Sequence, residues 1–83
     1  MTDPTILLEE IDRLLEADAE LQRKKLLKLG RSLLPHLTED DLAQPHDYEE
    51  LRGSEQFNFE DGYLAGILGA QMAIRARIGS KYR

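Results

Sequence analysis

The amino-acid sequence predicts an all-α protein: a small three-helix bundle with extra short helical turns, completed by dimerisation through its C-terminal helix. Leucines recur at helical spacing through the first 34 residues, and a glycine- and alanine-rich segment near the end has acids before it and bases after it. No segment alternates apolar and polar residues as a strand would. The 83 residues suit one domain, 1–83, and a monomer of this size buries only about 60–65% of its unfolded surface.

The first predicted helix spans about 4–16. Asp3 is suited to cap it, and Pro4 is suited to its first position. Its apolar residues occupy about 120° of the helical circumference and predict a core-facing stripe: Leu7, Leu8, Ile11, Leu14 and Leu15. The stripe is interrupted at residues 17–19, where we expect a break or kink, although one helix running through is the alternative.

The second predicted helix spans about 19–34 and has a leucine face opposite a basic face. Gly30 lies within the leucine face, which costs about 1 kcal/mol relative to alanine unless a neighbour packs closely there. Pro35 is expected to end the helix. The basic patch on the other side consists of Lys24, Lys28 and Arg31. A solvated face is the plain interpretation of this patch, and contact with phosphate groups, an acidic partner or a membrane surface is the alternative.

The sequence predicts an ordered acidic connector over residues 36–56, with one or two short helical turns. Thr38 to Asp41 resembles a capping box with Asp in its fourth place, and Gly53 is suited to end the last turn. A connector of this length is longer than an ordinary loop of a helical bundle.

The C-terminal helix is predicted over 59–78, with Asn58 as its cap and Gly79 as its stop. Glycine inside a helix is unfavourable, so its small residues indicate close approach by another backbone. We therefore predict self-association of two chains through Gly62, Gly66, Gly69, Ala73, Tyr63 and Ile67. The alternative is a compact monomer whose glycines pack against Leu26 and Leu33. The uncharged run of 13 residues from Gly62 to Ile74 is too short to cross a membrane, which needs about 20.

Charge is segregated along the chain although the net charge is only −5. Residues 1–21 carry −6, residues 22–38 carry +5, residues 39–61 carry −8 and residues 62–83 carry +4. We expect these blocks to pair within the fold or across a dimer. The acidic balance, with a pI of about 4.9, argues against nucleic-acid binding.

Little in the sequence indicates catalysis or a cofactor. The absence of cysteine excludes disulfides and thiolate chemistry, and the three serines lie in no recognisable nucleophile motif. His36, His46 and Glu49 are the candidate ligands for a metal or small ligand, but each histidine adjoins a proline in a predicted turn and their spacing fits no ligand motif. We expect no enzyme activity and no cofactor.

An aromatic cluster precedes the last helix, and it is expected to seal the junction with the connector or, if exposed, to anchor a partner. The candidate partner-binding residues are Tyr48, Leu51, Phe57 and Phe59. The sequence thus predicts a non-catalytic protein–protein interaction module of the cytoplasm, such as an adaptor, chaperone-like or regulatory subunit. Its expected partners are a second copy of itself and a protein with a basic surface. A metal- or small-ligand-binding bundle is the alternative.

Overall fold

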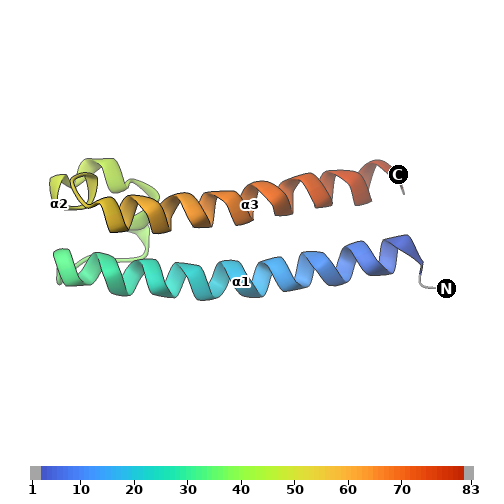
Figure 1. The fold of residues 1–83 in the computed structure, drawn as a ribbon, viewed down its shortest axis with the longest axis horizontal. Coiled ribbons are helices and arrows are strands. Elements are labelled where there is room, and N and C mark those ends of the chain that lie inside the picture. The colour runs from blue at the N-terminus through green and yellow to red at the C-terminus, as the bar shows by residue number, and fades with distance from the viewer. Residues whose placement is uncertain (1–2, 82–83) are drawn as a thin grey trace.

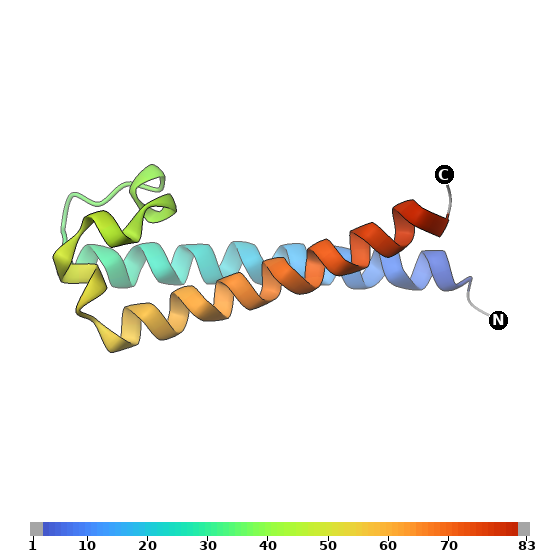
Figure 2. The same ribbon diagram turned by 90° about the horizontal axis from the view of Figure 1, so that it is seen from above.

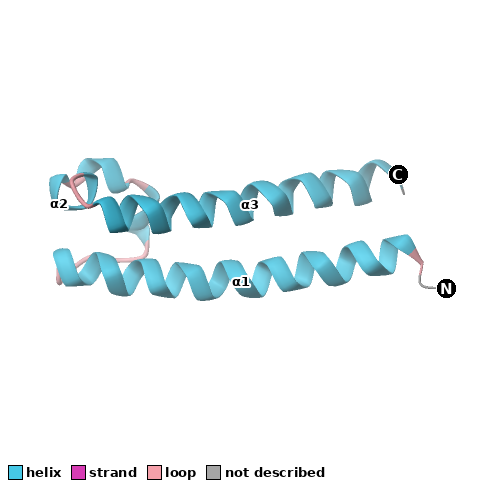
Figure 3. Ribbon diagram, viewed as in Figure 1, coloured by secondary structure: helices cyan, strands magenta, loops and turns pink. Residues whose placement is uncertain are grey.

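The computed structural model describes residues 3–81 and confirms the all-α fold class. Two long helices, α1 (Pro4–Leu33) and α3 (Glu55–Lys81), lie side by side in opposite directions (Figure 1). Between them the chain forms two 3₁₀ turns, η1 (Asp40–Ala43) and η2 (Pro45–Asp47), and the short helix α2 (Glu49–Arg52). Helices account for most of these residues and loops for the short links between them (Figure 3). The molecule is a helical hairpin of 49 × 20 × 19 Å whose closed end carries the connector.

The predicted break at residues 17–19 is wrong, because α1 is one helix of 30 residues. Alanine is the strongest helix former, so Ala17 and Ala19 favour continuation. Ala19 is also fully buried, and its small side chain allows α3 to come close at this point. The predicted ends of α1 are confirmed: Asp3 accepts a hydrogen bond from the Thr5 N–H at 2.7 Å, and the helix ends two residues before Pro35. The prediction of a three-helix bundle is thus corrected: the protein has two long helices and one short one.

The predicted limits of the C-terminal helix are also wrong at both ends. Ser54, not Asn58, caps α3, since its Oγ accepts the Phe57 N–H at 3.1 Å. The Asn58 side chain instead donates to the Arg52 carbonyl oxygen at 2.9 Å. Gly79 lies inside the helix, which continues to Lys81.

The connector is ordered, as predicted, and it packs on one side of the hairpin at the closed end (Figure 2). The capping box is present: the Thr38 N–H donates to Asp41 Oδ2 at 2.9 Å, and the Asp41 N–H donates to Thr38 Oγ1 at 3.3 Å. The apolar side chains of the connector complete the main core, which consists of Leu26, Leu37, Leu51 and Phe57. The close neighbours that Gly30 requires are Leu37 and Phe57, since a Cβ at Gly30 would overlap Leu37 Cδ2 and lie 3.4 Å from Phe57 Cε2.

The α1–α3 interface follows a heptad pattern. Buried or half-buried positions alternate three and four residues apart on both helices, as in a coiled coil. They are positions 5, 8, 12, 15, 19, 22 and 26 of α1 and positions 57, 60, 64, 67, 71, 74 and 78 of α3. Several of these positions are polar, and their bonds determine how the helices are aligned.

Candidate functional site

A buried polar cluster joins the two long helices near the closed end. Gln22 Nε2 donates to the Glu60 carbonyl oxygen at 2.9 Å and to Glu60 Oε2 at 2.6 Å. Lys25 Nζ lies 3.1 Å from Glu60 Oε1. The hydrogen bond from Gln22, followed by that from Lys25, lowers the pKa of Glu60. The carboxylate therefore remains charged in a site where only 8% of its residue surface is exposed.

A second polar cluster joins the helices nearer the open end. Gln71 Nε2 donates to Glu16 Oε2 at 2.7 Å. Arg75 donates from Nε to Asp12 Oδ1 at 2.9 Å and from Nη2 to Glu16 Oε2 at 3.2 Å. Both clusters join a block of negative charge to a block of positive charge, so the expected pairing of charge blocks does occur within the fold. These bonds favour the observed register of the two antiparallel helices over registers in which one helix is shifted along the other.

The small-residue seam of α3, made of Gly62, Gly66, Gly69 and Ala73, faces away from α1 and is exposed. Apart from the local helix backbone, no atom lies within 4 Å of the position that a Cβ would take at any of the three glycines. The alternative of a compact monomer with these glycines against Leu26 and Leu33 is therefore wrong. Of the other residues assigned to self-association, Tyr63 is half exposed, whereas Ile67 is buried at a heptad position facing α1.

The four candidate partner-binding residues divide between core and surface. Leu51 and Phe57 are fully buried in the core at the closed end, so they are not available to a partner. Tyr48 is half-buried and its hydroxyl donates to Asp41 Oδ1 at 2.8 Å. This bond raises the pKa of Tyr48, while the Thr38 N–H and then Tyr48 lower the pKa of Asp41. Phe59 alone of the four is largely exposed, at 69%.

The basic patch is only partly free. Lys24 and Lys28 are exposed, but Arg31 Nε donates to the Leu37 carbonyl oxygen at 2.8 Å and so holds the turn after α1. The candidate metal ligands His36, His46 and Glu49 are all exposed. Within residues 3–81 no three histidine, aspartate or glutamate side chains come together in a way that could hold a metal ion.

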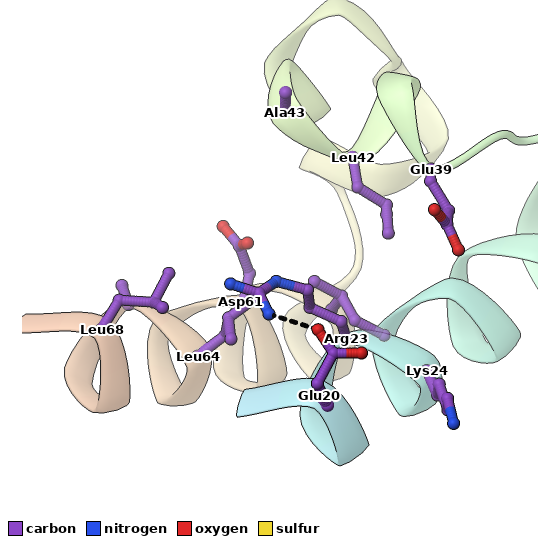
Figure 4. A pocket seen from close by; sticks show the side chains of 11 residues that line it. Glu20, Arg23, Lys24, Glu39, Leu42, Ala43, Asp61, Leu64 and Leu68 are labelled. Carbon is purple, nitrogen blue, oxygen red and sulfur yellow. Dashed lines mark hydrogen bonds and ion pairs between the residues drawn. The ribbon is translucent and has the colours of Figure 1, made fainter. Parts of the chain in front are cut away.

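A groove of about 420 Å³ lies between α1, α3 and η1 (Figure 4). Leu42 of η1 points toward the two helices from above, and Leu64 and Leu68 of α3 line the other wall. Charged side chains of both signs surround it, including Arg23, which pairs with Glu20 at 3.0 Å. The groove marks the side of the hairpin on which the connector packs.

The structure also shows a surface that the sequence pattern hid. The stripe predicted to face the core is divided: Leu8 and Leu15 lie at heptad positions toward α3, whereas Leu7, Ile11 and Leu14 are exposed. Leu21, two turns beyond Leu14, is exposed as well. The sequence did contain a signal of this exposed surface, because the apolar arc of about 120° is wider than one neighbouring helix covers.

Comparisons with known proteins add no further constraint. No protein family, characterised protein or solved structure matches the chain. None of the helices in the described residues is long and apolar enough to cross a membrane.

Proposed function

We propose that the protein is a non-catalytic interaction module that binds other protein and associates with itself. The observation that carries this proposal is the amount of large apolar surface left exposed along both long helices. Isolated surface hydrophobics need no explanation, but contiguous ones mark interaction sites. The exposed side chains include Leu7, Leu14, Leu21, Phe59 and Tyr63.

The small core supports the proposal. Among the described residues, four of the six buried apolar side chains lie at the closed end, and only Ala19 and Ile67 are buried elsewhere along the hairpin. Ordering a chain of this size costs about 1.5 kcal/mol per residue, so small domains commonly need oligomerisation or another added constraint. A partner that covers the exposed leucines would supply the missing burial.

The small-residue seam supports self-association independently of the leucines. Each glycine costs about 1 kcal/mol in helix propensity relative to alanine. Within one chain this cost is uncompensated at Gly62, Gly66 and Gly69, since nothing packs on them. Close contact with the backbone of a second chain would compensate it.

A second contact, with a basic partner protein, is proposed for the acidic connector. Glu39, Asp40, Asp47, Glu49 and Glu50 are all exposed there. Such charges govern association rate and selectivity more than affinity. Phe59, which follows the connector, is an exposed aromatic of the kind that anchors interfaces.

Sedimentation equilibrium over a range of concentrations tests the self-association. We expect a mass of twice 9.5 kDa at high concentration and dissociation on dilution. Gly66→Leu is expected to move the equilibrium toward the monomer without loss of helix, because the position has open space in the single chain. A monomer at every concentration would contradict the proposal.

A further inference from the structure

Four exposed apolar side chains of α1 form one stripe. At 100° per residue, Leu7, Ile11, Leu14 and Leu21 lie within an arc of about 80°. This arc is turned by roughly 100° from the arc of Ala19, Gln22 and Leu26, which faces α3. The stripe is therefore a second apolar surface of α1, separate from the one that α3 covers.

Two aromatic residues of α3 continue this surface. The groove and the connector occupy the other side of the hairpin, where α1 presents Glu20 and Arg23 and α3 presents Asp61 and Leu68. At 100° per residue, Phe59 and Tyr63 fall on the flank of α3 opposite to that of Asp61 and Leu68. This flank is on the same side of the hairpin as the leucine stripe. We call the six residues Leu7, Ile11, Leu14, Leu21, Phe59 and Tyr63 the leucine face. The connector does not extend over this side (Figure 2).

We infer that a second copy of the chain docks on the leucine face, giving a four-helix assembly in which each long helix runs antiparallel to the helix it meets. This inference rests on the proposed self-association and adds where and how the copies meet. The glycine seam borders the leucine face on α3, since Gly66 lies about 20° from Phe59 around the helix. A second copy on the leucine face would therefore also approach Gly66. The hairpin measures 49 × 20 Å across its long side. That is enough for the roughly 800 Å² that each partner contributes to a standard stable interface.

Charge favours a second copy and sets its direction. Both long helices are acidic at the start and basic at the end: α1 passes from a −6 block into a +5 block, and α3 from Glu55, Glu60 and Asp61 to Arg75, Arg77 and Lys81. The ion pairs Lys25–Glu60 and Arg75–Asp12 show that antiparallel alignment brings unlike charges together. The same alignment between copies repeats this complementarity, whereas parallel neighbours would set like charges side by side. The exposed charges Glu10 and Lys28 border the leucine stripe, and the exposed Asp18 lies within its arc between Leu14 and Leu21. All three would take part.

Two matched variants test the docking surface by sedimentation equilibrium. Leu14 and Met72 are equally exposed, at 70% and 71%, but only Leu14 belongs to the leucine face. We expect Leu14→Glu to raise the dimer dissociation constant by about 100-fold or more, because it places an unpaired charge in an apolar contact. Met72→Glu should leave the constant within a few-fold of wild type. Circular dichroism establishes that both variants remain helical.

The outcomes separate this inference from the proposed function. If wild type is monomeric throughout, self-association itself fails. If wild type dimerises but Leu14→Glu dimerises equally well, or Met72→Glu is the variant that dissociates, self-association stands and the leucine face is not the contact. Lys28→Glu tests the direction: we expect a weaker dimer at 50 mM NaCl and a smaller difference at about 500 mM, where charge is screened. A dissociation constant equal to that of wild type at low salt would overturn the antiparallel placement.

Discussion

Two glycines of the long helices lie in opposite environments, and replacing each by alanine separates packing from helix propensity. Gly69→Ala adds a methyl group where no neighbouring atom lies within 4 Å. The variant should gain about 1 kcal/mol of unfolding free energy from propensity alone. For a domain of this size that corresponds to a rise of about 4–8 °C in Tm.

Gly30→Ala has the same gain in propensity but meets the core. The added methyl overlaps Leu37 Cδ2, and Leu37 is itself only 3% exposed among Leu26, Leu51 and Phe57. Because the side chain cannot move freely away, we expect an overpacking cost of about 1–3 kcal/mol. The propensity gain is common to both variants, so the difference between them equals that cost.

Urea denaturation followed by circular dichroism measures the difference. The protein should be dilute, so that the unfolding free energy of the single chain is observed. Gly69→Ala should be more stable than wild type and Gly30→Ala less stable than Gly69→Ala by about 1–3 kcal/mol. Equal stability of the two variants would refute the packing of the connector against Gly30.

Two further predictions concern the core and the polar interface. Phe57→Ala should cost about 3–5 kcal/mol of unfolding free energy, since Phe57 is fully buried. Phe59→Ala in the dilute monomer should stay within about 0.5 kcal/mol of wild type. Similar losses of unfolding free energy in urea titrations of both variants would contradict the assignment of Phe57 to the core. The pKa of Glu60 is lower in the folded chain than the value of about 4.3 for an unfolded one. Its contribution is therefore complete above that pH and lost as the pH falls through the folded-state pKa. Wild type should lose more stability than Glu60→Gln between pH 6 and about pH 3, and identical pH profiles would show that the bonds to Gln22 and Lys25 do not stabilise the carboxylate.

Local signals were sufficient for much of the secondary structure. The Asp3 cap, the end of α1 before Pro35 and the capping box at Thr38 are short-range features, and all three are present. The break at residues 17–19 was wrong because the apolar stripe alone cannot show that a buried alanine, such as Ala19, continues it. The start of α3 was wrong because Ser54 and Asn58 are both suitable caps, and the packing of Phe57 into the core favours Ser54.

The α1–α3 interface was harder to predict because it contains polar residues. Glu60 and Gln71 occupy heptad positions of α3, and each is hydrogen-bonded to a side chain of α1. A search for apolar residues at helical spacing does not identify such polar residues as part of the interface. With these positions unrecognised, the face containing Ile67 was assigned to self-association although it faces α1. The seam glycines were predicted to meet another backbone, but only the three-dimensional arrangement shows that they face away from α1.

We propose that one chain leaves too much apolar surface exposed to function alone. The most direct test is the molecular mass of the wild-type protein in solution, measured by sedimentation equilibrium over a wide range of concentrations. We expect a reversible equilibrium between 9.5 kDa and twice that mass. A well-folded monomer at all concentrations, with the leucine face and the glycine seam in contact with water, would contradict it.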